Sequence, residues 1–314
     1  MAILETKNLT YTYGVGTPFE KTAVENVNLS VEKGAFVGVI GHTGSGKSTL
    51  IQMLNGLIRP TSGQVLLNGE DIWTKPKEIR RVRFQVGMVF QYPEYQLFEE
   101  TCYKDIAFGP KNMGLDEAEV DRRVHEAADF VGLDPALLER SPFELSGGMR
   151  QRVMIAMAMV CKPKLLIADE PTTALDVTIE AQILRLMKEL RDETGMSVLI
   201  ITHNMGVVAE ICDYVYVMYA GKIMEQAETF ELFDHTMHPY TKGLLDSIPR
   251  IGQNAERLHT IPGVVPNLLH LSQGCPFSNR CEYATDQCRT EKAQLHPVAP
   301  DHQVRCFRCE EEHQ

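Results

Sequence analysis

The sequence predicts an α/β protein in which a mainly parallel sheet is covered by helices, and three observations point to this fold class. A short apolar segment at 36–40 runs directly into a glycine-rich loop and then into a helical pattern. After residue 160, apolar strand-like segments alternate with helical ones, which is typical of parallel strands joined by crossover helices. The first thirty residues instead alternate apolar and polar side chains, which indicates a smaller antiparallel sheet.

Length and composition exclude several classes of protein. The 314 residues allow about two domains and a sizeable core. With 44% hydrophobic and 23% charged residues, the chain is neither disordered nor collagen-like. Its net charge of −11 disfavours nucleic acid as a partner, because phosphate neutralisation needs clustered Lys and Arg. The sequence contains no apolar run of the roughly 20 residues that span a membrane and no signal-peptide pattern, so we expect a cytosolic protein.

In the N-terminal half, the apolar pattern predicts each element in turn. Antiparallel strands are expected within 3–31, a buried strand at 36–40, a helix over 50–57 and a strand at 65–67. Five basic side chains within 75–83 are interpreted as a solvated helix face rather than a binding patch.

In the C-terminal half, the helical pattern comes first. Apolar residues recur on one face of a helix expected over 116–131, and Asp116 is placed to cap its start. The alternation that follows predicts strands at 165–168, 198–201 and 214–218, and a helix over 179–194. Beyond about residue 236, seven prolines interrupt any regular pattern, so we expect a separate, loop-rich C-terminal extension.

The glycine-rich loop has the spacing of a phosphate-binding loop (P-loop), Gly41-His42-Thr43-Gly44-Ser45-Gly46-Lys47-Ser48. Glycines allow backbone N–H groups to surround phosphate oxygens, and the following helix presents its positive N-terminal end. Lys47 would reach the β- and γ-phosphates, and the Ser48 hydroxyl would coordinate Mg²⁺. A chance glycine-rich turn is the alternative, but the flanking strand and helix favour a nucleotide site.

The apolar strand at 165–168 ends in two carboxylates, Asp169 and Glu170. Beside a P-loop, Asp169 can hold Mg²⁺ through water and Glu170 can orient the attacking water. Two acids after a strand are common and weak evidence alone, but the P-loop makes the pair specific.

With further motifs, the sequence resembles the ATP-binding subunits of ABC transporters over about residues 1–235. The motifs that carry the resemblance follow the P-loop in this order: Phe90-Gln91, Leu145-Ser146-Gly147-Gly148, Asp169-Glu170, Ala174-Leu175-Asp176 and His203. The resemblance implies an ABC ATPase fold of the P-loop NTPase class. Its nucleotide-binding core would comprise 1–91 and 161–235, and its helical subdomain 92–160, followed by the extension at 236–314.

The resemblance also implies roles for residues around ATP and Mg²⁺. Adenine would stack on Tyr13, although a buried strand tyrosine is the alternative interpretation. The remaining ATP contacts would come from Gly41, Gly44, Ser45, Gly46, Lys47, Ser48 and Thr49. The implied catalytic residues are Glu170, His203 and Gln91, and the implied Mg²⁺ ligands are Ser48, Gln91 and Asp169. His203 would contact the γ-phosphate, the alternative being a core histidine.

Partners are implied in the same way. Ser146, Gly147 and Gly148 would contact ATP held by a second ATPase subunit, identical or related, and Asp176 would lie at the dimer interface. Membrane permease subunits would bind the helical subdomain, with Tyr92, Tyr95, Leu97 and Phe98 as anchors; helical core is the alternative role for these side chains. The chain would then act peripherally at the cytoplasmic face of the cell membrane.

Within the family, the two parts of the chain resemble different members. Residues 1 to about 144, including 11–20 and 90–98, resemble the second ATPase of energy-coupling factor transporters, which import vitamins and metal ions. From Ser146 onward, with Met149-Arg150-Gln151-Arg152 and His238-Pro239-Tyr240-Thr241, the chain resembles oligopeptide and dipeptide transporter ATPases. We therefore expect an ATPase of an importer, with peptides as the first candidate cargo and an energy-coupling factor importer as the alternative. A soluble ABC ATPase acting on DNA or ribosomes and a non-hydrolysing scaffold are less consistent with these motifs.

Five of the eight cysteines lie in the last forty residues. In a cytosolic protein they are not expected to form disulfides. The region resembles the C-terminal region of peptide ATPases, some of which hold a four-iron cluster. That resemblance implies a 4Fe–4S site formed by Cys275, Cys281, Cys288 and Cys306, with zinc or free thiols as alternatives and Cys309 as a spare thiol.

Overall fold

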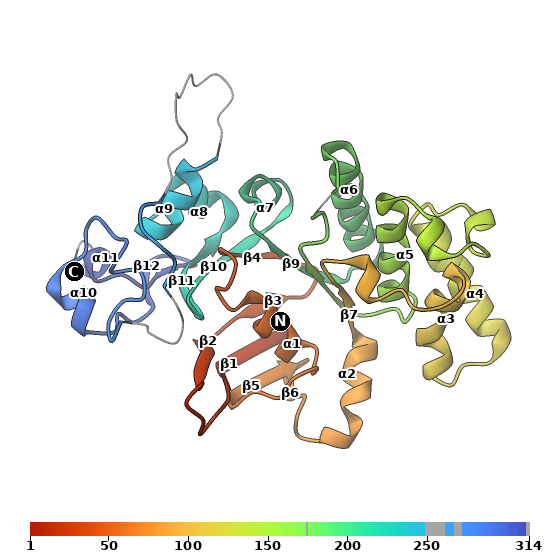
Figure 1. Cartoon of the computed structure of the whole chain (residues 1–314), viewed down its shortest axis with the longest axis horizontal. Helices are drawn as coiled ribbons and strands as arrows, with labels where there is room; N and C mark the ends of the chain where they lie inside the picture. The colour runs from red at the N-terminus through yellow and green to blue at the C-terminus, as the bar shows by residue number, and fades with distance from the viewer. Residues whose placement is uncertain (174, 249–260, 267–271, 312–314) are drawn as a thin grey trace.

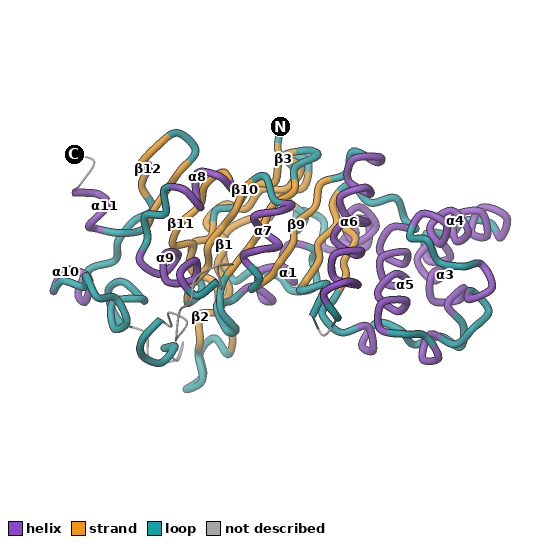
Figure 2. The backbone as a smooth tube through the Cα atoms, turned by 90° about the horizontal axis from the view of Figure 1, so that it is seen from above, coloured by secondary structure: helices purple, strands orange, loops and turns teal. Residues whose placement is uncertain are grey.

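The computed structural model describes residues 1–173, 175–248, 261–266 and 272–311. Two sheets occupy the middle of an elongated molecule (Figure 1). The helices of the 100–160 region form one end, and the C-terminal segment forms the other (Figure 2). In the part of the chain that the structure describes, no helix is long and apolar enough to cross a membrane.

The smaller sheet is antiparallel, as the alternation of the first residues predicts. Its order is β2-β1-β5-β6, and β3 pairs with β1. The strands are β1 (Ala2–Tyr13), β2 (Lys21–Val27), β3 (Ser30–Glu32), β5 (Ser62–Leu67) and β6 (Glu70–Asp71). Leu4, Leu9 and Val24 are completely buried on its inner face. Burial of that apolar face holds this sheet against the central one.

The central sheet has eight strands in the order β12-β13-β11-β10-β4-β9-β8-β7. They are β4 (Phe36–Ile40), β7 (Val86–Val89), β8 (Leu165–Asp169), β9 (Ser197–Thr202), β10 (Tyr214–Tyr219), β11 (Lys222–Glu228), β12 (His296–Ala299) and β13 (His302–Val304). The strands from β10 to β7 are parallel. This confirms the predicted α/β class. Four strands of this sheet, β7, β11, β12 and β13, are additions to the predicted set.

Both faces of the central sheet are covered, as a parallel sheet requires. Along β4, Phe36 and Ile40 join the core on the side of the large helices, whereas Val37 and Val39 join the core shared with the antiparallel sheet. The covering helices are α1 (Lys47–Leu54), α2 (Ile79–Gln85), α6 (Val177–Thr194), α7 (Met205–Ile211) and α8 (Thr229–Asp234). Helix α2 has one buried residue, Val82, which agrees with a solvated basic face at 75–83.

The helical end of the molecule consists of α3 (Cys102–Asn112), α4 (Glu117–Phe130) and α5 (Gly147–Met159). Asp116 caps α4 as predicted, because its side chain accepts a hydrogen bond from the Glu119 N–H at 2.9 Å. Val120, Val124, Ala127 and Ala128 form the buried face of α4.

The C-terminal extension is not separate from the core, which corrects that expectation. Strand β13 pairs with β11, so the extension adds two strands to the edge of the central sheet. An edge strand such as β11 presents unpaired backbone groups that another strand can satisfy. The extension also contains α9 (Pro239–Asp246), α10 (Asp286–Thr290) and α11 (Phe307–Glu311).

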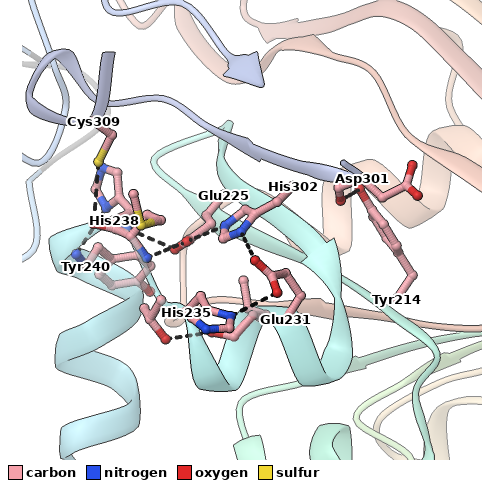
Figure 3. Close-up of polar contacts among 12 residues, drawn as sticks. Tyr214, Glu225, Glu231, His235, His238, Tyr240, Asp301, His302 and Cys309 are labelled. Carbon is pink, nitrogen blue, oxygen red and sulfur yellow. Dashed lines mark hydrogen bonds and ion pairs between the residues drawn. The ribbon is translucent and has the colours of Figure 1, made fainter. Parts of the chain in front are cut away.

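A buried ion pair reinforces this junction. His302 Nε2 on β13 lies 2.9 Å from Glu225 Oε1 on β11, and the two side chains are 1% and 0% exposed. Figure 3 shows that Glu225 also faces the start of α9, where its carboxylate accepts the N–H groups of Met237 at 2.7 Å and His238 at 3.1 Å. Burial opposes a charge on His302, but hydrogen bonds with Glu225 and Glu231 raise its pKa above the ordinary 6.5.

Replacing Glu225 by Ala should therefore destabilise the protein. The change leaves His302 Nε2 and two backbone N–H groups buried without their acceptor, so the free energy of unfolding should fall by about 3–5 kcal/mol. Chemical denaturation measures the loss. Glu228→Ala, at the exposed end of the same strand, is the matched control and should change stability by less than about 0.5 kcal/mol.

The loss should also depend on pH. A pKa raised in the folded state contributes stability that is complete below pH 6.5 and disappears as the pH rises through the folded value. The difference between the parent and Glu225→Ala should be larger at pH 6 than at pH 9. An equal difference at both values would contradict a charged His302.

Candidate functional site

Ten of the residues that the sequence analysis assigns to ATP or Mg²⁺ line one cavity of about 330 Å³. The cavity lies where the parallel strands β4, β8 and β9 end. The ten residues are Tyr13, Gly44, Gly46, Lys47, Ser48, Thr49, Gln91, Asp169, Glu170 and His203. The structure therefore collects side chains that are up to 190 residues apart in the sequence.

The loop between β4 and α1 requires glycine at two positions for steric reasons. Gly46, the N-cap of α1, has a φ of 100°, and a side chain there would collide with the Ala23 carbonyl. A side chain at Gly41 would collide with the Met218 carbonyl at the end of β10. Gly41 and Ser45 are part of this loop but do not line the cavity, and the Ser45 side chain is completely buried.

Lys47 supplies a buried positive charge in the cavity. Its side chain is buried, and Nζ donates hydrogen bonds to the carbonyls of Gly41 at 2.5 Å and His42 at 3.0 Å. Burial lowers the pKa of Lys47, whereas Glu170 and Asp169 favour its charged form. A lysine beside the N-terminus of a helix is well placed to attract phosphate.

Asp169 and Glu170 lie opposite Lys47 at the end of β8. Burial, together with the neighbouring charge of Glu170, raises the pKa of Asp169 to about 6, although Lys47 and a hydrogen bond from Ser48 act in the other direction. Two carboxylates and a hydroxyl side by side form an oxygen-rich donor set, which suits Mg²⁺. These residues therefore fit the predicted metal.

Glu170 follows β8, and its side chain contacts one residue from the end of each neighbouring strand, β7 and β9. Its Oε2 accepts a hydrogen bond from Gln91 Nε2 at 2.9 Å, and its Oε1 lies 3.2 Å from His203 Nδ1. Gln91 follows β7 and His203 follows β9. The φ of Glu170 is +45°, in the left-handed region that non-glycine residues rarely occupy. Such backbone strain is concentrated at functional sites. His203 is exposed rather than part of the core.

Tyr13 lies at the open side of the cavity with 41% of its surface exposed. Its ring packs edge-on against Tyr11, and its hydroxyl lies 3.1 Å from Thr49 Oγ1. This exposure excludes the alternative of a buried strand tyrosine.

Lys21, which the sequence analysis missed, also lines the cavity because it pairs with Tyr13 across β1 and β2. The antiparallel pairing expected within 3–31 could have indicated that Lys21 lies beside Tyr13.

Besides Gly41 and Ser45, four predicted ligand residues lie outside the cavity. Ser146 caps α5 and Asp176 caps α6, each through its own side chain. Gly147 and Gly148 form the first turn of α5, and a Cβ on Gly148 would come within 2.7 Å of Ile179 on α6. Each therefore has a local structural role. Ala174, from the same motif as Asp176, lies outside the described residues.

The segment after Gln91 presents aromatic side chains at the surface. Tyr92, Tyr95 and Phe98 are 43%, 83% and 58% exposed, and Phe98 packs edge-on against Phe108 of α3. Leu97 is 3% exposed and belongs to the core, so its expected role as a docking anchor is wrong. Leu97 packs instead in the core that includes Cys102 and Ile106 of α3.

The four cysteines of the predicted metal site, Cys275, Cys281, Cys288 and Cys306, line one small cavity in the extension. Burial raises the pKa of Cys275 to about 11, and a hydrogen bond from Cys309 lowers the pKa of Cys306 to about 6. Cys309 does not line this cavity; it is buried, and its thiol donates a hydrogen bond to the Met237 carbonyl at 3.6 Å. Among the described residues, no group of three or more His, Cys, Asp or Glu side chains is arranged to hold a metal ion.

Comparison with known families and proteins gives matches to both parts of the chain. Residues 24–173 match the ABC transporter family, and residues 224–288 match the C-terminal region of oligopeptide/dipeptide transporters. The energy-coupling factor transporter ATP-binding protein EcfA2 of Caldanaerobacter subterraneus subsp. tengcongensis is 47% identical over 255 residues, which are 81% of this chain and 88% of that protein. The oligopeptide transport ATP-binding protein OppD of Haemophilus influenzae is 44% identical over 280 residues, covering 85% and 86% of the two chains.

Solved structures show the same likeness. The protein cbiO1 from Clostridium perfringens, part of the ABC transporter complex cbiONQ, superimposes with a TM-score of 0.68 at 37% identity, over 74% of this chain and 91% of that one. The dimeric ABC transporter cassette MJ0796 gives a TM-score of 0.65 at 30% identity, over 72% and 98%.

Proposed function

Because the chain belongs to the ABC transporter family as one of its ATPase subunits, we propose that it energises an importer, hydrolysing ATP in the cavity between the P-loop and Glu170. One observation carries the proposed chemistry. Glu170 meets Gln91 and His203 at the ends of three adjacent strands, opposite the buried Lys47.

In this proposal each residue of the cavity has a part. The P-loop N–H groups and Lys47 bind the phosphates, and Tyr13 stacks on adenine. Mg²⁺, bound by Ser48, Gln91 and Asp169, would neutralise charge on the phosphates. Glu170 accepts a proton from the attacking water as the water oxygen bonds to the γ-phosphorus and ADP departs with the electrons of the broken P–O bond. His203 contacts the γ-phosphate.

Replacing Glu170 by Gln should keep ATP binding and slow hydrolysis by a factor on the order of 10²–10⁴, since it removes a general base. Steady-state phosphate release measures the rate. Glu193→Gln, on the exposed side of α6, is the control and should hydrolyse ATP at the parent rate. Hydrolysis by Glu170→Gln at the parent rate would refute the role given to Glu170.

We further propose that two such subunits act together, identical or related. Ser146, Gly147 and Gly148 lie outside the cavity of their own chain, at the exposed start of α5. A glycine-rich helix N-terminus is an anion site, so it would serve the ATP of a second subunit. The dimeric cassette MJ0796 supports this arrangement. ATP binding would close the pair and hydrolysis would reopen it. The pair would act peripherally at the cytoplasmic face of the membrane.

The membrane partner is inferred from the exposed aromatic segment, Tyr92, Tyr95 and Phe98. Exposed aromatic side chains are typical anchors of an interface. This segment belongs to the part that resembles energy-coupling factor ATPases, and relatives of that kind match at up to 47% identity. We therefore place an energy-coupling factor importer first. A peptide importer is the second candidate, supported by the match at 224–288 and by OppD.

Docking can be tested with pull-downs against permease subunits of both kinds. Tyr95→Ala and Phe98→Ala should each weaken binding to the energy-coupling factor permease by about 2 kcal/mol, roughly thirtyfold. Phe230→Ala, an exposed aromatic residue on α8 outside this segment, is the matched control. Binding only to peptide permeases, unaffected by either substitution, would reject this docking surface and leave the peptide importer.

For the extension we propose a 4Fe–4S cluster held by the four cysteines of its small cavity. Four thiols around one cavity support this proposal, because 4Fe–4S clusters are held by four cysteine thiolates. The cations Lys222, Lys292 and Arg305 lie around Cys275 and would offset the charge of four thiolates.

Protein prepared without oxygen and with iron should contain about four irons per chain and absorb visible light. Cys281→Ser should lose that absorption, while Cys161→Ser, outside the cavity, should retain it. ATP binding should persist in both variants. Colourless protein with one zinc per chain would favour the alternative ligand.

A further inference from the structure

The motif His238-Pro239-Tyr240 forms the first turn of α9 in the extension, and its geometry determines where Tyr240 lies. His238 is the N-cap, and its Nδ1 accepts the Tyr240 N–H at 3.0 Å (Figure 3). Pro239 occupies the first helical position, where its restricted φ favours the helix. Tyr240 is 1% exposed, so its hydroxyl needs a partner inside the protein.

That partner is the P-loop. The Tyr240 hydroxyl accepts a hydrogen bond from the backbone N–H of His42 at 3.0 Å and lies 3.2 Å from His42 Nδ1. Burial lowers the pKa of His42 to about 4, so the imidazole is neutral at physiological pH. The extension thus contacts the second residue of the P-loop across 198 positions of sequence.

One planar peptide unit, Gly41–His42, connects the Tyr240 hydroxyl to Lys47. The His42 N–H and the Gly41 carbonyl belong to the same planar peptide unit, so they cannot turn independently. On its other side, the Gly41 carbonyl accepts a hydrogen bond from Lys47 Nζ at 2.5 Å. Fixing the N–H therefore also fixes the carbonyl that holds the lysine.

From this geometry we propose that Tyr240 is a positioning residue for ATP binding, which orients the Gly41–His42 peptide and thereby holds Lys47 in place for the phosphates. The proposal rests on the role proposed above for Lys47. It adds that the C-terminal extension completes the nucleotide site, and it gives the His-Pro-Tyr motif a function.

Aromatic packing keeps Tyr240 in this position. Its ring centroid lies 4.6 Å from that of Tyr219 on β10 and 5.5 Å from that of Phe277. Phe277 is 2% exposed and lies two residues after Cys275, so the cysteine-bearing segment supports the tyrosine directly. Tyr219 in turn packs against the His42 ring at 4.8 Å. Buried rings in such contacts restrict one another's orientation.

The test is Tyr240→Phe, which keeps the ring and removes the hydroxyl. Affinity for a fluorescent ATP analogue should fall about three- to tenfold, the effect of one lost hydrogen bond, and KM for ATP should rise more than kcat falls. Tyr219→Phe removes a hydroxyl from the same aromatic cluster and should change the affinity less than about twofold. If circular dichroism shows that both variants are folded and their affinities for the analogue are equal, the proposal is overturned.

A double-mutant cycle separates positioning from a general structural effect. If Tyr240 acts through Lys47, then Tyr240→Phe should change affinity less than about twofold in a Lys47→Ala background. If the fold-losses in affinity of the two single variants multiply in the double variant, the proposed connection is overturned. Unchanged nucleotide binding in Lys47→Ala alone would instead refute the role of Lys47, so the two failures are distinguishable.

Discussion

Parallel pairing of β4, β9 and β8 is the constraint on which the rest of this structure depends. Residues Phe36–Ile40 pair with β9 in register, and β9 pairs with β8, so all three strands end at the same edge. The P-loop, His203 and the Asp169–Glu170 pair are therefore neighbours although they lie far apart in the sequence. Tyr13, the last residue of β1 in the antiparallel sheet, lines the same cavity.

Opposite charges meet at that edge around Lys47. One buried ammonium faces two carboxylates, and the site places Asp169 and Glu170 so close together that burial and mutual repulsion disfavour the ionised form of Asp169. Such a site gains free energy when it takes up an anion at Lys47 and a cation at the carboxylates together. ATP with Mg²⁺, the ligand proposed for this cavity, would meet both requirements.

The C-terminal extension is part of the same unit. Strand β13 extends the central sheet, the Glu225–His302 pair ties it to β11, and Tyr240 contacts the P-loop. His42 belongs to the part that resembles energy-coupling factor ATPases, whereas Tyr240 belongs to the part that resembles peptide ATPases. The two parts of the chain therefore meet at the nucleotide site itself, and both contribute to the core on the side of the large helices.

The sequence by itself determined the fold class, the P-loop and the acidic strand end, because each rests on a local pattern: apolar periodicity, glycine spacing and a carboxylate after a buried strand. It also placed Asp116 at the start of α4, since capping depends on four adjacent residues. It missed β7, which has four residues, and β11, whose KIMEQAE pattern favours neither helix nor strand. Only the tertiary structure decided that Leu97 is core, that Cys309 lies outside the cavity of the other four cysteines and that Tyr240 reaches His42. Those outcomes depend on contacts between distant segments, and the physical reason is that burial and hydrogen bonding are properties of packed neighbours, which a sequence pattern does not specify.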